Sequence, residues 1–202
     1  MASNESLISD SYKKANQKLH GSSNYGNVNQ YIENKTLNIV RGLAKAGFCK
    51  SVLDYGCGRG SLVELLTQNL PGDIRVDGYD PGNTKYDKAY KPADVVTSYD
   101  VLEHIERSKI NEVLNDIHSY TKNYFICIID LLPAIKNLED GRNAHILLAP
   151  PGWWLEKLSE RFEMGHYYIH DNGPLNQNLC FVGCKRKDTP NISSQVFYRT
   201  FF

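Results

Sequence analysis

The segment Val52-Leu53-Asp54-Tyr55-Gly56-Cys57-Gly58-Arg59-Gly60 is the most informative part of this sequence. Its apolar first half predicts a strand, its second half carries glycine at alternate positions, and a helical pattern begins at Leu62. Glycine lets the backbone turn tightly and approach a ligand without side-chain clash. The first turn of the following helix presents backbone N–H groups that have no partner within the helix. The segment therefore predicts a ligand-binding loop between a strand and a helix.

Acidic side chains lie at the ends of two predicted strands. Asp54 belongs to the strand that leads into the glycines, and Asp80 follows 26 positions later, at the end of the predicted strand 75–79. A carboxylate as close to the ligand as Asp54 would repel a pyrophosphate and favours a ligand with an ammonium or sulfonium group. A carboxylate at the tip of the second strand suits a ribose, because it can accept hydrogen bonds from both hydroxyls. Taken alone, Asp80 also fits a turn-capping role ahead of Pro81.

The rest of the chain alternates between strand and helix patterns. We predict strands at 51–55, 75–79, 94–98, 124–129, 167–169 and 179–184, and helices at 29–46, 62–70, 109–120 and 153–162. This alternation predicts an α/β fold, with a mostly parallel sheet covered by helices on both faces. No helix separates the last two strands, so we expect them to pair as an antiparallel hairpin at one edge of the sheet.

A third motif, Asp100-Val101-Leu102-Glu103-His104-Ile105, follows the predicted strand 94–98. Together with the glycine segment and Asp80, it resembles the motifs of class I S-adenosylmethionine-dependent methyltransferases, in the same order, over about residues 50–187. The resemblance implies a Rossmann-like sheet of seven strands and S-adenosylmethionine as the cofactor. Only thirteen residues separate Asp80 from Asp94. We therefore expect the third strand of this family to be very short, near 86–89, or missing, and the residue that contacts the adenine stays unassigned.

The same resemblance implies a set of residues around the cofactor. The glycine loop would approach the methionyl part, Asp80 would hold the ribose hydroxyls, and the end of the strand 94–98 would line the amino-acid end. An N-terminal lid would cover the cofactor with Tyr25. The expected cofactor-binding residues are Tyr25, Asp54, Gly56, Cys57, Gly58, Asp80, Pro81, Ser98, Tyr99 and Asp100.

Two histidines and an arginine are candidates for catalysis. Methyl transfer by direct displacement needs alignment and, for a hydroxyl or amine acceptor, a base. His104 opens a helical turn after the strand 94–98, and His145 lies in a polar loop that also holds Arg142. His104 would otherwise serve as a capping or supporting residue. In the alternative interpretation of the loop, Arg142 pairs with Asp140 and is structural.

Several other classes of function fit the sequence less well. The segment 99–102 lacks the motif of amino-methylating DNA enzymes, and no Pro-Cys pair suggests cytosine C5 chemistry. Asp100 and Asp130 are the two carboxylates that a metal-dependent catechol type would need, but two carboxylates are thin evidence, and we expect no metal. A small-molecule or glycan-like acceptor is favoured. A non-catalytic S-adenosylmethionine-binding module or partner subunit remains the alternative.

The composition of the chain limits the classes of protein and partner that fit the sequence. The chain has 202 residues, 41% of them hydrophobic, with 23 Lys+Arg against 23 Asp+Glu, so its formal net charge is zero. We therefore do not expect a nucleic-acid partner, because the chain has no excess positive charge to attract one. The five cysteines are expected to be reduced, and no apolar run reaches the ~20 residues of a membrane helix, so a cytoplasmic protein is expected.

The predicted elements divide the chain into three parts. We expect an N-terminal lid or helical segment at 1–48, a methyltransferase domain at 49–187 and a tail at 188–202. The oligomeric state is not predicted.

Overall fold

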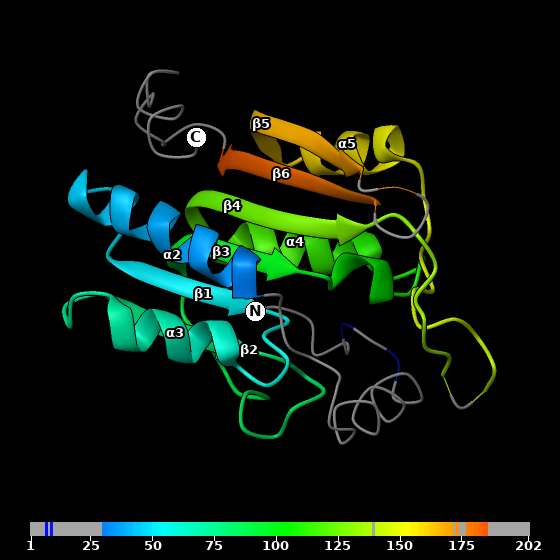
Figure 1. Cartoon of the computed structure of the whole chain (residues 1–202), viewed down its shortest axis with the longest axis horizontal. Helices are drawn as coiled ribbons and strands as arrows, with labels where there is room; N and C mark the ends of the chain where they lie inside the picture. Colours follow the sequence, from blue (N-terminus) through cyan, green and yellow to red (C-terminus); the bar gives the residue numbers. More distant parts are fainter. Residues whose placement is uncertain are drawn as a thin grey trace.

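The computed structural model describes residues 7, 9, 30–138, 140–171, 173 and 177–185. They form one six-stranded sheet with the order β2-β1-β3-β4-β6-β5 (Figure 1). The first four strands in this order are parallel, β6 runs antiparallel to β4, and β5 runs antiparallel to β6. The strands are β1 (Ser51–Tyr55), β2 (Arg75–Tyr79), β3 (Ala93–Tyr99), β4 (Thr121–Asp130), β5 (Phe162–Asp171) and β6 (Gln177–Lys185). The predicted parallel sheet and its antiparallel edge hairpin are confirmed.

Helices cover both faces of the sheet. On one face α2 (Gln30–Lys45) and α3 (Ser61–Asn69) pack on a cluster that includes Val52, Val95 and Tyr124. On the other face α4 (Ile110–Tyr120) and α5 (Pro151–Ser159) pack on a second cluster, which includes Phe125 and Trp154. In each helix the apolar residues recur every three or four positions, which puts them on the side that faces the sheet. The architecture is the three-layer α/β arrangement that the sequence predicts.

The third strand of the expected seven is absent between β2 and β3. Residues 80–92 form turns, and β2 is therefore an edge strand. Two tyrosines of this connection fill the space: Tyr86 is buried below the glycine loop, and the Tyr90 ring lies 4.4 Å from the Tyr79 ring. The Tyr90 hydroxyl also donates a 2.5 Å hydrogen bond to Asp116 on α4. The connection 80–92 is too short for a further strand beside β2, and its aromatic side chains pack there instead.

Strand β5 is longer than predicted. The predicted range 167–169 covers only its centre, because Glu163-Met164-Gly165-His166 interrupts the alternation of apolar and polar residues. The pairing with β6 shifts register between Met164 and His166. A register irregularity of this kind disturbs the two-residue period on which strand prediction depends.

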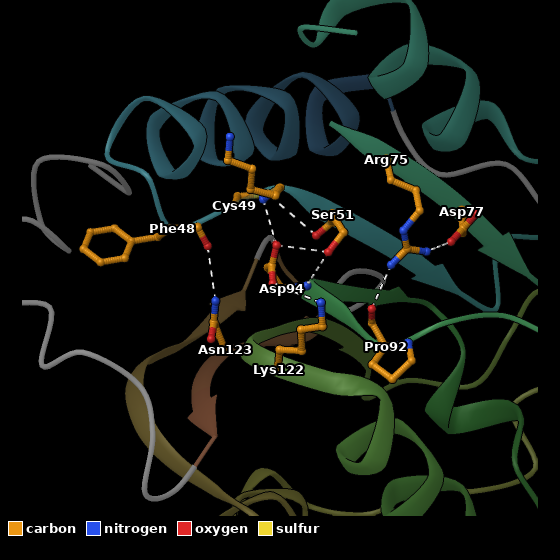
Figure 2. Close-up of polar contacts among 10 residues, drawn as sticks. Phe48, Cys49, Ser51, Arg75, Asp77, Pro92, Asp94, Lys122 and Asn123 are labelled. Atoms are coloured by element: carbon orange, nitrogen blue, oxygen red, sulfur yellow. Dashed lines mark hydrogen bonds and ion pairs between the residues drawn. The ribbon is translucent and has the colours of Figure 1, made fainter. Parts of the chain in front are cut away.

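Polar contacts tie the sheet together at the amino ends of its strands (Figure 2). The Asp94 carboxylate accepts hydrogen bonds from the Lys50 backbone N–H at 2.8 Å and from the Ser51 hydroxyl at 3.0 Å. Arg75 on β2 forms an ion pair with Asp77 and donates a 2.7 Å hydrogen bond to the Pro92 carbonyl. These contacts are structural, and they lie at the opposite end of the strands from the glycine loop.

Two further expectations from the sequence concern the cysteines and the apolar character of the helices. All five cysteines are free, with Cys49, Cys57 and Cys127 buried and the other two partly buried. Within the described ranges, no helix has the length and apolar character needed to cross a membrane. Tyr25, most of the expected N-terminal segment before residue 30 and the tail 188–202 lie outside the described residues; of residues 1–29, the structure describes only Leu7 and Ser9.

Candidate active site

The glycine loop turns sharply at the carboxyl end of β1. Gly56 has φ 80° and Gly60 has φ 85°, and both values lie in the left-handed region that favours glycine. The backbone N–H groups of Gly56 and Cys57 both donate to the Tyr79 carbonyl, at 2.7 and 3.0 Å. A Cβ atom on Gly56 would collide with the Val101 side chain. The loop is therefore locked between β2 and the motif that follows β3.

Asp80 is fixed at the tip of β2, directly beside this loop. One carboxylate oxygen accepts the Gly58 backbone N–H at 2.8 Å, and the other accepts the Gly82 N–H at 2.7 Å. The side chain is 6% exposed. These bonds fix the position of the Asp80 carboxylate at the tip of β2, where its oxygens, each with two lone pairs, suit the hydroxyls of a ribose. The bond to Gly82 shows that Asp80 also caps the turn at Pro81.

Asp54 is the most strongly buried acid of the loop region, with 2% of its surface exposed. Burial raises its pKa to about 7; the nearby Asp80 and Glu33 charges add to this rise, and a hydrogen bond from Thr97 opposes it. Glu33 on α2 has a buried carboxylate oxygen without a hydrogen-bond partner among the described residues. A buried, acid-rich site of this kind suits a ligand that carries positive charge.

The end of β3 holds the three residues that were predicted at the amino-acid end of the cofactor. Ser98 is buried, and its hydroxyl has no hydrogen-bond partner in the described part of the chain. The Tyr99 hydroxyl instead points to α2, 2.8 Å from the Thr36 hydroxyl. Asp100 has φ 53°, the one positive value among the described non-glycine residues, and its side chain is exposed. The surrounding protein and the Asp130 charge raise the pKa of the Asp100 carboxyl.

His104 and His145 come together although they are 41 positions apart in the sequence. Their ring centroids lie 4.9 Å apart, with the planes nearly perpendicular at 78°. His104 lies in the short 3-10 helix η1 (Leu102–His104), after β3, and His145 lies in the connection between β4 and α5. In Figure 1 the arrowheads of β1, β3 and β4 point to the side on which this yellow-green connection runs. The two histidines are thus at the carboxyl edge of the sheet, where open α/β sheets bind ligands.

The connection that carries His145 is held by its own polar side chains. The Asn143 amide accepts the N–H groups of Ala134 and His145, at 2.9 and 3.0 Å, and donates to the Ala134 carbonyl at 2.8 Å. The Leu147 N–H donates to the Glu103 carbonyl at 2.9 Å, which fastens the connection to η1. These bonds place His145 against His104.

Arg142 is more exposed than the histidines. Its guanidinium donates to the Asp140 carboxylate, with Nε–Oδ2 at 2.8 Å, and its side chain is 53% exposed. This ion pair is the one expected if Arg142 has a structural role in the loop. An exposed pair of this type contributes about 0–1 kcal/mol, so the contact does not prevent Arg142 from exchanging Asp140 for an anionic acceptor.

Three residues at the site were not among the predicted site residues, although Glu103 belongs to the motif that follows β3. Thr97 bonds Asp54 at 2.8 Å, Glu33 faces Asp54 from α2, and Glu103 is fully buried beside His104. Parallel pairing of β1 with β3, which sets Asp54 opposite Thr97, was the available signal for the first. Nothing local in the sequence of α2 indicates that Glu33 approaches β1.

Comparison with known proteins defines the class. The model of a family described as methyltransferase domain matches residues 16–172, which is more than half of the chain. No curated protein matches the sequence. Solved structures share the fold at low identity, and this likeness concerns the fold alone.

Three of these structures show how different the proteins with this fold are. The N-methyltransferase NodS from Bradyrhizobium japonicum, in complex with S-adenosylhomocysteine, is 10% identical with a TM-score of 0.58, over 88% of this chain and 100% of NodS. Magnesium protoporphyrin IX methyltransferase from Synechocystis, with bound S-adenosylmethionine, is 14% identical with a TM-score of 0.56, over 90% and 100%. The small RNA methyltransferase HEN1 is 14% identical with a TM-score of 0.57, over 81% of this chain and 26% of HEN1.

The fold and the edge of the sheet define a Rossmann-like protein that binds a nucleoside cofactor. The chain belongs to the methyltransferase-domain family and is a class I S-adenosylmethionine-dependent methyltransferase. The acid-rich site around Asp54 and the rigid glycine loop agree with this cofactor, which combines a sulfonium, an ammonium and a ribose.

Proposed function

We propose that the chain transfers the methyl group of S-adenosylmethionine to an oxygen or nitrogen of a small-molecule or glycan-like acceptor, with the His104–His145 pair supplying the base. The observation that carries this proposal is the anchoring of both rings. His104 Nδ1 lies 2.8 Å from the Ala144 carbonyl oxygen, and His145 Nδ1 lies 2.6 Å from the Leu132 carbonyl oxygen. A carbonyl can only accept, so each Nδ1 carries the proton, and each Nε2 of a neutral ring carries the lone pair.

The reaction needs one bond to form and one to break. A lone pair of the acceptor oxygen or nitrogen attacks the methyl carbon, and the carbon–sulfur bond breaks with its electron pair moving to sulfur. The sulfonium becomes the neutral thioether of S-adenosylhomocysteine. The acceptor proton passes to a histidine Nε2 and then to solvent. Alignment of acceptor, methyl carbon and sulfur contributes most of the rate increase, because the displacement has strict geometry.

The cofactor residues keep their predicted roles in this proposal. The glycine loop with Cys57 approaches the methionyl part, Asp54 favours its positive charges, and Asp80 beside Pro81 binds the ribose. Ser98, Tyr99 and Asp100 line the amino-acid end, with Tyr99 contributing through its backbone.

The proposed N-terminal lid has one point of support. The Ser9 backbone N–H and hydroxyl both donate to the Glu106 carboxylate, each at 2.9 Å. Leu7 packs against the core cluster on the α4 face. Glu106 follows η1 closely, so this part of the N-terminal segment lies at the ligand edge of the sheet. Tyr25 remains the proposed cover of the cofactor.

The acceptor class follows from size and charge. NodS and the porphyrin enzyme match along their whole chains, whereas HEN1 matches over 26% of its chain. The net charge of zero provides no general attraction for RNA. Arg142, beside the histidines along the chain, would bind an anionic or sugar-like group of the acceptor.

A radiolabel experiment tests the proposal. The chain is incubated with S-adenosylmethionine labelled in the methyl group and, in separate reactions, with total RNA or with the low-molecular-weight fraction of a deproteinised cell extract. We expect label in the low-molecular-weight products, with turnover lowered about 10²–10⁴-fold in His104→Ala or His145→Ala and the affinity for S-adenosylhomocysteine unchanged. Transfer to RNA alone would overturn the acceptor class, and equal turnover of both variants and wild type would overturn the base assignment.

A further inference from the structure

A carboxylate and two imidazoles converge at the ligand edge of the sheet. Glu103, His104 and His145 each offer one ligand atom, and these atoms all lie within 4.8 Å of one another. Two of the residues come from η1 and the third from the connection after β4, so the fold itself assembles the group. Ligands around one metal ion stand about 3–3.5 Å apart, so binding an ion would require these three atoms to move closer together than the 4.8 Å limit.

The imidazoles already have the orientation that a metal site requires. Metal-binding histidines usually donate the N–H of one ring nitrogen to a carbonyl or carboxylate, which fixes the ring and leaves the other nitrogen as ligand. His104 and His145 both do so, through Nδ1, to the carbonyls of Ala144 and Leu132. In both rings Nε2 is therefore the atom suited to coordination.

Glu103 supplies the independent observation. The side chain is fully buried, with 0% exposed. Its Oε1 accepts the Asp130 backbone N–H at 2.9 Å, whereas Oε2 has no hydrogen-bond partner among the described residues. A buried carboxylate oxygen without a partner destabilises the fold unless a cation or a hydrogen-bond donor satisfies it. Asp100 and Asp130 add negative charge around it, which a bound cation would offset.

We propose that Glu103, His104 and His145 bind a divalent transition-metal ion of the Zn²⁺, Mn²⁺ or Fe²⁺ type, with an open position toward the acceptor. Two imidazoles with one carboxylate favour these ions over Mg²⁺ or Ca²⁺, which prefer oxygen ligands throughout. This site differs from the expectation of no metal, which considered Asp100 and Asp130 as the candidate metal ligands. Only the task of the ion rests on the proposed function, and that task is to bind an oxygen of the acceptor and lower its pKa. An ion on Nε2 would occupy the lone pairs of both rings, so in the metal-bound enzyme the histidines would be ligands only, and the acceptor proton would pass directly to water instead of to a histidine.

Cobalt binding tests the site without any acceptor. Co²⁺ is titrated into the full untagged chain after chelator treatment, and binding is followed by visible absorption and by calorimetry. We expect one equivalent to bind, with bands typical of nitrogen and oxygen ligands and without the intense near-ultraviolet band of thiolate ligands. His145→Ala and Glu103→Gln should bind at least about tenfold more weakly. His170→Ala, which removes an exposed histidine of β5, is the matched control and should bind like wild type.

Affinity for S-adenosylhomocysteine is measured on every variant. An unchanged value shows that a variant has folded, and it keeps the two proposals separate. Wild type that binds the nucleoside but no Co²⁺, Mn²⁺ or Zn²⁺ would overturn the metal site and leave the methyltransferase function intact. Binding of metal equally by wild type and both ligand variants, or with thiolate bands, would also overturn it. Metal binding without transfer to any acceptor would contradict the proposed function alone.

Discussion

The Thr97 hydroxyl donates a 2.8 Å hydrogen bond to Asp54 Oδ1, across the parallel pair β1 and β3. Both side chains are buried, and the bond favours the ionised carboxyl while burial opposes it. Burial is the larger effect, so the pKa of Asp54 rises to about 7. The groups that act on Asp54, or on which it acts, are Glu33, Asp80, Cys57 and Tyr99. Asp54 is therefore an acid whose charge depends on whether a cation is bound next to it.

The affinity for S-adenosylmethionine should rise with pH through neutrality. The positive groups of the ligand favour the ionised form of Asp54 and lower its pKa, so ligand binding releases a proton below about pH 7. We expect the dissociation constant to fall, by up to about tenfold per pH unit, between about pH 6 and about pH 7. Calorimetry across this range measures it. Asp54→Asn should bind more weakly and lack this part of the dependence, and identical profiles for both proteins would contradict the assignment.

The same acid should make the ligand-free fold less stable as pH rises. The folded-state pKa of about 7 lies above the ordinary aspartate value of 3.8, so the folded chain holds a proton that the unfolded chain releases in this range. The stabilisation is present near pH 4 and is lost as pH rises through about 7. Between about pH 5 and about pH 7 we expect Asp54 to lower the free energy of unfolding by about 2 kcal/mol.

Urea unfolding of wild type and Asp54→Asn at several pH values isolates this contribution. Asp100 and Glu103 also have raised pKa values and change stability in the same direction, but both proteins retain them. The difference between the two proteins should therefore grow with pH. A difference that does not vary from about pH 5 to about pH 7 would show that Asp54 is already ionised in the folded chain.

Local patterns in the sequence account for most of the fold. Strand β2 has its predicted bounds, and α4 begins within one residue of the prediction, because Ile110, Val113, Leu114 and Ile117 repeat at helical spacing. The glycine loop and Asp80 were also recognisable, since their geometry depends on neighbours along the chain. Such features need no knowledge of tertiary contacts.

The arrangement of residues at the carboxyl edge of the sheet was harder to predict. His104 and His145 were named as separate candidates, but their pairing depends on a connection that has no periodic pattern and is held by Asn143. Glu103 Oε2, which has no hydrogen-bond partner among the described residues, belongs to a fully buried side chain, and neither fact can be read from its neighbours along the chain. Tyr86 likewise fills the space below Gly60 only because the third strand is missing. Each of these follows from contacts between distant segments.

Gly56→Ala should destabilise the chain more than a matched glycine substitution elsewhere. Gly47 has φ 81°, nearly the φ 80° of Gly56, but a Cβ atom there meets no atom within 4 Å. Gly47→Ala therefore incurs only the left-handed backbone cost, about 1–2 kcal/mol. Gly56→Ala adds a collision with Val101, and we expect a further 1–3 kcal/mol, about the cost of overpacking. Chemical unfolding measures both. Equal losses for the two variants would mean that Val101 can move aside.

Asp80→Asn should weaken binding in a way that depends on the ribose. The carboxylate accepts from Gly58 and Gly82 with different oxygens, and an asparagine side chain can accept with only one of its two terminal atoms. Hydrogen bonds to a charged group contribute about 1.5–3 kcal/mol each, so S-adenosylhomocysteine should bind at least tenfold more weakly to the variant.

The 2′-deoxy analogue of S-adenosylhomocysteine separates a ribose contact from a purely structural role of Asp80. If the carboxylate binds the ribose hydroxyls, the analogue has already lost part of that interaction in wild type, and Asp80→Asn should weaken its binding less than that of the parent compound. A double-mutant cycle over the two proteins and two ligands gives this coupling directly. If the substitution weakens both ligands equally, Asp80 acts only by holding Gly58 and the turn at Gly82 in place.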